Sequence, residues 1–235
     1  MKVVILETGR PPAALRDRHS DYPTMFRALL APVDPALRFE TVAVVDGAAP
    51  PAPREADAFL ITGSPAGVYE DHAWIAPLEA HIRAAADAGV PQIGICFGHQ
   101  VMAQAFGGRV AKSDKGWGVG RHTYEIVDAP AWMDPAPQRF ALAASHQDQV
   151  IEAPPGARVL ARSAHTDYAA LAYAEGPAVS FQGHPEMTAS FTADLVASRR
   201  GRIPDAIVDD ALASLADPLD AASVATWMAR FIRAA

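Results

Sequence analysis

Short apolar runs alternate with helix-spaced segments along the first 108 residues of the chain. The apolar runs are typical of buried strands and cover residues 2–6, 39–45, 58–61 and 90–95. Segments whose apolar residues have helical spacing cover residues 22–30, 74–88 and 97–106. Apolar strands that alternate with helices form a mostly parallel sheet covered on both faces. We therefore expect an α/β fold in which a mostly parallel sheet is flanked by helices.

The pattern changes after Gly108. Short strand-like runs separated by turns follow at residues 119–127, 140–144, 159–162, 169–174 and 178–182. These runs indicate a smaller portion of the fold with antiparallel pairing. From Met187 to Ala235 the spacing is helical, with interruptions at Pro204 and Pro218. We expect one domain over residues 1–187 and a C-terminal helical extension, residues 188–235, packed on the same domain.

The composition excludes several classes of protein. The chain has 235 residues, a formal net charge of −7 and one cysteine. The acidic balance argues against a general nucleic-acid binder, and one cysteine cannot form an intrachain disulfide or a cysteine-rich zinc site. No stretch approaches the ~18 apolar residues of a membrane helix, and the apolar run at the N-terminus is too short for a signal peptide. We expect a cytoplasmic protein that binds neither nucleic acid nor membrane.

The single cysteine lies between an expected strand and an expected helix, in the sequence Gly94-Ile95-Cys96-Phe97-Gly98-His99-Gln100. A free cysteine is most often a small buried hydrophobe. Glycines two residues before and after it, at a junction of strand and helix, are instead typical of a nucleophile elbow. The helix that begins at Phe97 directs its N-terminus at the sulfur and favours the thiolate. The pattern therefore favours Cys96 as a nucleophile.

A cysteine nucleophile in acyl transfer needs a histidine base and a group that orients it. His184 follows an apolar strand, and Pro185 keeps it extended, so Glu186 projects to the same side and is placed to fix its tautomer. To act as a base His184 must be neutral, so activity is expected to fall at acid pH. His99 lies alongside the helix and is interpreted as a buried packing residue. Five other histidines stand in polar or turn-like contexts and are expected to be solvated. They are His19, His72, His81, His122 and His165.

An acyl-transfer site also needs donors for the oxyanion. One would be the backbone N–H of Phe97, which directly follows the nucleophile. The other is expected from the loop after a neighbouring strand, and residues 61–67 form such a loop of small side chains.

Together these segments resemble the class I (triad) glutamine amidotransferase family. The resemblance rests on residues 94–100, on Gln182-Gly183-His184-Pro185-Glu186, on Thr62-Gly63-Ser64-Pro65 and on Ser145-His146-Gln147-Asp148-Gln149-Val150. It implies a flavodoxin-like fold over roughly residues 1–187 and a catalytic triad of Cys96, His184 and Glu186. It also implies an oxyanion hole from Ser64 and Phe97. The residues implied to contact the substrate are Gly63, Gln100, Ser145 and His146.

The activity that the resemblance implies is attack of Cys96 on the γ-carboxamide of glutamine, with a γ-glutamyl thioester and release of ammonia. The alternatives are a γ-glutamyl peptidase, which acts on γ-glutamyl peptides or conjugates, and a non-catalytic regulatory or partner-binding protein. The partners expected are the small-molecule substrate and, for transfer of ammonia, a synthase subunit in trans. No cofactor or metal is expected, because the chain has no P-loop or G-x-G-x-x-G motif and its candidate metal ligands are scattered.

Overall fold

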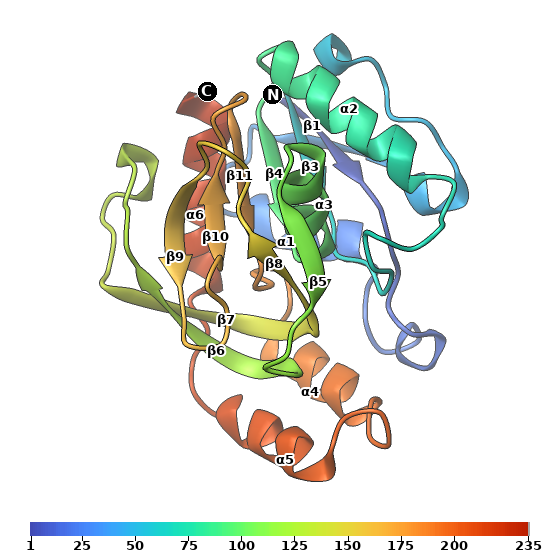
Figure 1. Cartoon of the computed structure of the whole chain (residues 1–235), viewed down its shortest axis with the longest axis vertical. Helices are drawn as coiled ribbons and strands as arrows, with labels where there is room; N and C mark the ends of the chain where they lie inside the picture. Colours follow the sequence, from blue (N-terminus) through green and yellow to red (C-terminus); the bar gives the residue numbers. More distant parts are fainter. Residues whose placement is uncertain (235) are drawn as a thin grey trace.

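Five neighbouring strands run parallel at the centre of the structure, a computed structural model that describes residues 1–234 (Figure 1). In the order in which they pair, they are β2 (Arg38–Val42), β1 (Lys2–Leu6), β3 (Ala58–Ile61), β4 (Gln92–Ile95) and β11 (Ala178–Phe181). Because the strands are parallel, their carboxyl ends lie along one edge of the sheet. The α/β class predicted from the alternation of strands and helices is confirmed.

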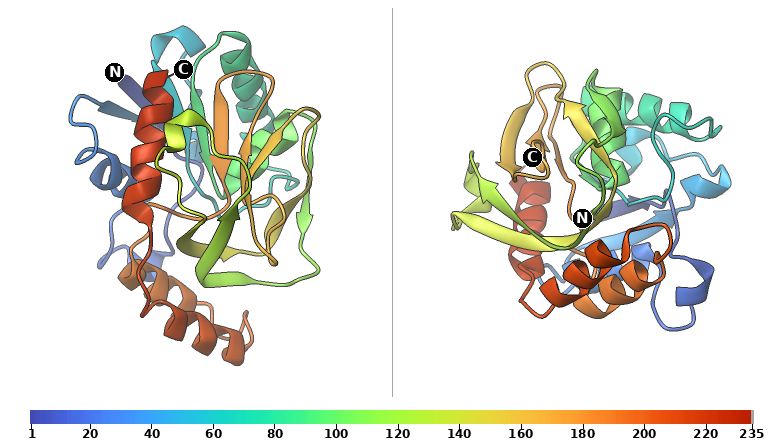
Figure 2. Two further views of the ribbon diagram at one scale, coloured as in Figure 1. Left: turned by 90° about the vertical axis from the view of Figure 1, so that its left-hand side faces the viewer. Right: turned by 60° about the horizontal axis from the view of Figure 1, so that its bottom comes forward.

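Helices cover both faces of these strands (Figure 2). Val3 and Ile5 of β1 pack with α1 (Tyr22–Leu30) and α6 (Ala221–Ala234). Val4 and Leu6, which alternate with them, pack with α2 (Ile75–Asp87) and α3 (Phe97–Ala105). Successive side chains of a strand point to opposite faces, so β1 is apolar throughout because both of its faces are buried.

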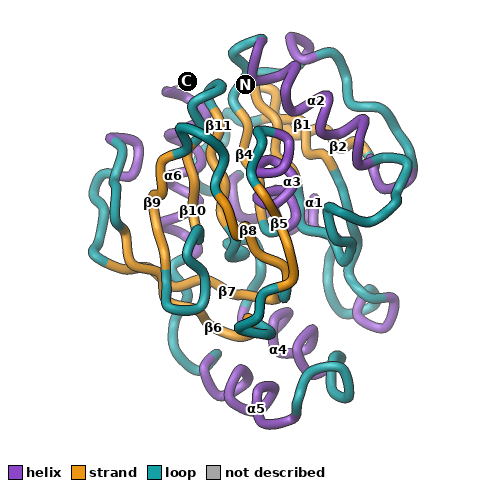
Figure 3. The backbone as a smooth tube through the Cα atoms, viewed as in Figure 1, coloured by secondary structure: helices purple, strands orange, loops and turns teal. Residues whose placement is uncertain are grey.

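Four antiparallel strands extend the sheet beyond β11 (Figure 3). They are β10 (Ala170–Ala172), β9 (Arg158–Arg162), β6 (Gly118–Ile126) and β7 (Arg139–His146). Two further strands, β5 (Arg109–Lys112) and β8 (Asp148–Glu152), form a separate two-stranded sheet. The sequence reasoning missed β5 and β8, because both are short, partly exposed and only weakly apolar.

The residues after 187 form three helices, α4 (Ala189–Ala197), α5 (Asp205–Ser214) and α6. Helix α4 contacts β7 and α5 contacts β6 at the lower end of the molecule in Figure 1. Helix α6 places Trp227 and Met228 in the same core as Val3 and Ile5. Ala235, the last residue of the expected extension, lies outside the described residues. Within residues 1–234, no helix has the length and apolar character needed to cross a membrane.

The junction between β4 and α3 leaves no room for side chains at its two glycines. A Cβ at Gly94 would lie 2.4 Å from the carbonyl oxygen of Gly98, and one at Gly98 would lie 2.3 Å from the carbonyl oxygen of Ile61. Both separations are far below van der Waals contact. The first turn of α3 can therefore rest directly on β3 and β4 only because these two positions are glycine.

We predict that Gly98→Ala lowers the free energy of unfolding by about 2 kcal/mol, because an overpacking cost of about 3 kcal/mol against backbone outweighs the gain of about 1 kcal/mol in helix propensity. The matched control is Gly201→Ala, at a φ of +84° with open space around it. There only the backbone strain of about 1 kcal/mol is expected. Urea unfolding of both variants measures the difference. Equal losses of unfolding free energy in the two variants would show that the close approach of Gly98 to Ile61 does not matter for stability.

Candidate active site

Three adjacent strand ends bring distant parts of the sequence together. Strand β4 pairs in parallel with β3 on one side and with β11 on the other. The N–H of Cys96, just after β4, donates to the carbonyl of Phe181 at 2.9 Å, and the N–H of Gly98 donates to the carbonyl of Thr62 at 3.1 Å. These two bonds tie the start of α3 to both neighbouring strands. Residues 62–64, Cys96 and His184 therefore meet at one edge of the sheet.

Cys96 has a strained backbone conformation. Its φ is 55° and its ψ is −101°, and within residues 1–234 it alone among non-glycine residues has a positive φ. Such a conformation costs about 1–3 kcal/mol and is often found at functional sites. The side chain is 5% exposed and lies at the N-terminus of α3, where helix dipoles favour a thiolate. The elbow predicted from the two flanking glycines is present.

Gly63 lies against both Cys96 and His184. A Cβ at this position would be 3.0 Å from His184 Cε1 and 3.7 Å from Cys96 Cβ. A larger residue here would press on the imidazole. Its neighbour Ser64 lies on the wall of the pocket around the cysteine.

His184 and Glu186 form a buried pair beyond the end of β11. Their Nδ1 and Oε1 atoms are 2.7 Å apart, and the backbone N–H of His184 donates to the carbonyl of Ala143 at 2.8 Å. Burial lowers the pKa of His184, but the negative charges of Glu186 and Cys96 and the hydrogen bonds to them outweigh it and raise that pKa from 6.5 to about 10.

The raised pKa of His184 changes the protonation state expected for this side chain. The sequence reasoning treated His184 as a neutral base, whereas its surroundings favour the imidazolium. In general, an imidazolium beside a cysteine favours the thiolate form of that cysteine.

A cavity of about 180 Å³, here called the first cavity, opens beside Cys96. Gln100, Ser145 and His146, which the sequence predicted to contact substrate, line it with Ser64. Gln100 donates to the carbonyl of Asp148 at 2.8 Å. Burial holds the pKa of His146 well below 6.5, so its imidazole is neutral. Phe97, in contrast, is fully buried with its ring against Trp74, so the role predicted for it depends on its backbone N–H alone.

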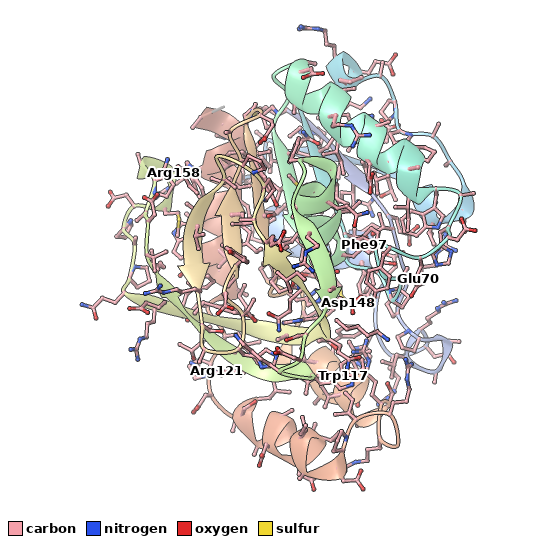
Figure 4. All side chains as sticks on the ribbon, viewed as in Figure 1. Glu70, Phe97, Trp117, Arg121, Asp148 and Arg158 are labelled. Carbon is pink, nitrogen blue, oxygen red and sulfur yellow. The ribbon has the colours of Figure 1, made fainter. Side chains whose placement is uncertain are left out.

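Charged residues that sequence reasoning missed also line the first cavity. Glu70 and Asp148 supply carboxylates, and Lys112, Arg199 and Arg202 supply cations. Figure 4 labels Glu70, Asp148 and Trp117 at this edge of the molecule. The Arg199 guanidinium donates to Ser145 Oγ at 2.7 Å and lies 5.3 Å from the centre of the Trp117 ring. Asp148 lies in residues 145–150, one of the segments on which the resemblance rests. Arg199 and Arg202 lie in the C-terminal extension, where no motif drew attention to them.

The remaining histidines divide into two groups. His99 is fully buried, as expected, and its Nδ1 lies 2.7 Å from Ser180 Oγ. The expectation that the other five are solvated is wrong for four of them. The side chain of His19 is 14% exposed, packs edge-on against Phe191 and lies 2.6 Å from Asp194 Oδ2. His81 packs edge-on against Phe59, and the rings of His122 and His165 lie 5.3 Å apart and close to His146. Desolvation lowers the pKa of both His81 and His122 to about 4. In the described part of the chain, no group of three or more histidine, cysteine or acidic side chains is arranged to hold a metal ion.

Comparison with known proteins places this site in a family. The family model described as glutamine amidotransferase class-I matches residues 39–197, more than half of the chain. A glutamine-hydrolyzing GMP synthase of Aquifex aeolicus (strain VF5) is 35% identical over 129 residues, which are 55% of this chain and 24% of that protein. The chain thus spans about a quarter of the length of that relative. Gamma-glutamyl peptidase 4 of Arabidopsis thaliana is 29% identical over 185 residues, which are 76% of this chain and 72% of that protein.

Solved structures agree with the fold. A glutamine amidotransferase from Thermotoga maritima matches with a TM-score of 0.75 and 18% identity, over 99% of this chain and 96% of that chain. The strand order, the elbow at Cys96 and the family match over residues 39–197 point to one conclusion. The chain belongs to the class I glutamine amidotransferase family.

Proposed function

We propose that this protein breaks γ-glutamyl amide bonds by covalent catalysis at Cys96, with glutamine as its default substrate and ammonia as the first product. The observation that carries this proposal is the grouping of a strained cysteine with a buried histidine–carboxylate pair whose Nδ1 and Oε1 are 2.7 Å apart. A cysteine beside a histidine that is oriented by a third group is the general arrangement of a nucleophilic triad.

In the first step the Cys96 thiolate attacks the γ-carbonyl carbon of the substrate. A bond forms between Sγ and carbon, and the carbonyl electrons move onto oxygen. We assign the backbone N–H groups of Ser64 and Phe97 as donors to that oxyanion. Each such donor contributes about 2.7–4 kcal/mol to transition-state stabilisation. When the tetrahedral intermediate collapses, the bond between carbon and nitrogen breaks, and protonated His184 gives its proton to the leaving nitrogen.

In the second step water replaces the amine. Once His184 has lost its proton, it is a base that can take a proton from the attacking water. The thioester bond breaks, glutamate leaves, and the thiolate and imidazolium are restored. Glu186 holds the imidazole orientation and favours its charged form in both steps.

The charges of the first cavity fit an amino-acid head group. The γ-glutamyl unit carries an ammonium and a carboxylate at its α-carbon. Glu70 and Asp148 can receive the ammonium, and Lys112 and Arg202 can receive the carboxylate, because all four line the same cavity as Cys96. We assign this cavity to the γ-glutamyl unit. Ammonia leaves for solvent or for a synthase subunit in trans.

A second candidate is a γ-glutamyl peptidase activity. It is favoured by the Arabidopsis relative of that name, of which this chain matches 72%, whereas it matches 24% of the GMP synthase. The values of kcat/KM on glutamine and on a γ-glutamyl dipeptide, with ammonia and glutamate both measured, separate the two activities.

We predict that Cys96→Ala abolishes covalent labelling by a glutamine-analogue electrophile and lowers glutamate release by at least about 10,000-fold, because no other group can form the thioester. Mass spectrometry locates the label and circular dichroism checks that the variant is folded. Since Cys96 is the chain's only cysteine, undiminished labelling of Cys96→Ala would mean that the electrophile modifies another residue and would remove the basis of the proposal.

We predict that Glu186→Gln moves the alkaline limb of the kcat/KM profile to lower pH by about 1–3 units, the range that a neighbouring opposite charge contributes. The sign follows because Glu186 raises the pKa of His184, so its loss makes the imidazolium deprotonate at lower pH. The matched control is Glu152→Gln, which removes an exposed carboxylate paired with Arg109 on the two-stranded sheet. An alkaline limb that stays in place in Glu186→Gln would contradict the pairing.

A further inference from the structure

A second cavity, of about 270 Å³, adjoins Cys96 on the side of His184. It shares Ser64, Ser145 and Arg199 with the first cavity, but Gln100 and His146 do not line it. The loop after β1 lines one wall of this cavity with Arg10, Pro11, Pro12 and Arg16. Figure 2 shows this loop and helix α4 together at the end of the molecule where the parallel strands finish.

The second cavity lies where the leaving group of the reaction must lie. The nitrogen that leaves takes its proton from His184, and His184 lines the second cavity and not the first. If the γ-glutamyl unit fills the first cavity, the group on the other side of the scissile bond faces the second. Ammonia, close in size to a water molecule of about 30 Å³, would leave most of this space unused.

The second cavity is lined by positively charged side chains and by no acidic ones. Three arginines line it, and none of its lining residues is an aspartate or glutamate. Arg10 is neutralised, since its guanidinium pairs with Glu7 and Asp46. Arg16 and Arg199 form no ion pair with any residue in the described part of the chain.

The two unpaired guanidiniums retain free donors. Arg16 uses its Nε to donate to the carbonyl of Pro11 at 2.9 Å, which leaves its two terminal nitrogens available. Arg199 is half-buried and donates from one terminal nitrogen to the neutral Ser145 hydroxyl. Arg16 is exposed, whereas Arg199 is held partly out of bulk water without a counterion, which is unfavourable. A carboxylate is the anion whose geometry the donors of a guanidinium match.

We propose that the second cavity receives the amino-acid leaving group of a γ-glutamyl amino acid, and that Arg16 and Arg199 bind the carboxylate of that group. The proposal rests on the proposed function, since it assumes attack by Cys96 on a γ-glutamyl amide. Both arginines lie outside residues 39–197, the part of the chain that the family model matches. They come from the loop after β1 and from the segment after α4.

The chemistry of the step is unchanged by the larger leaving group. The bond between Cys96 Sγ and the γ-carbonyl carbon forms, and the bond between that carbonyl carbon and the α-nitrogen of the leaving amino acid breaks. The electron pair of the broken bond stays on nitrogen, which takes the proton of His184. The free amino acid departs with its carboxylate released from the arginines, and water then hydrolyses the thioester to glutamate.

The test compares two substrates that differ by one charge. γ-Glutamylglycine and γ-glutamylglycinamide contain the same scissile bond, but only the first has a carboxylate on its leaving group. We expect the wild-type protein to have a kcat/KM roughly tenfold or more higher on γ-glutamylglycine, the factor that one charge-assisted hydrogen bond supplies. Arg16→Gln should bring the ratio of the two values close to one, and Arg16→Lys should retain part of it.

The matched control is Arg18→Gln. Arg18 stands two residues away on the same loop but pairs with Asp194 and does not line the second cavity. Its variant should keep the wild-type ratio. Equal kcat/KM values for the two substrates on the wild-type protein would overturn the proposal, as would an equal loss of preference in Arg18→Gln. If no γ-glutamyl compound, glutamine included, yields glutamate or acylates Cys96, the proposed function is wrong and this inference falls with it.

Discussion

The contact on which the site depends is the direct packing of the first turn of α3 against β3 and β4. Gly98 donates its N–H to the carbonyl of Thr62, and neither Gly94 nor Gly98 has space for a Cβ. With the helix held this close, the chain must reverse at Cys96, and the positive φ follows. The strain at the cysteine is supported by hydrogen bonds on both sides, so the sulfur is fixed at the sheet edge instead of relaxing into the core.

The electrostatics of the site depend on the same geometry. A buried imidazolium is costly unless it has anionic partners. His184 has two such partners, Glu186 and Cys96, and together they outweigh the effect of burial on its pKa. In the proposed mechanism, the histidine is therefore a proton donor at the start of the reaction and becomes a base only after the first product leaves.

The sequence predicted the parallel half of the fold to within a few residues, because β1, β3, β4 and β11 are buried on both faces and are short, mostly apolar runs. The bounds of β1, α1 and β3 match the prediction, whereas the expected strand at 39–45 ends at Val42. Strands β5 and β8 lack a continuous apolar signal. The residues proposed for the triad could be named because they lie in recognisable motifs. Arg16 and Arg199 could not, since a charged residue in a loop or at a helix end has no pattern that tells a solvated side chain from one that lines a cavity.

The residues proposed for catalysis and those proposed for specificity come from different parts of the chain. The strand ends that carry Cys96 and His184 lie in the region matched by the family model, which covers residues 39–197. The loop after β1 precedes that region and Arg199 follows it directly after α4, and both reach the same edge of the sheet, where they line the second cavity. Loops at the carboxyl ends of parallel strands can vary without disturbing the core. Under the proposed function, substitutions at positions such as Arg16 and Arg199 can thus change which amine leaves without disturbing the core that positions Cys96.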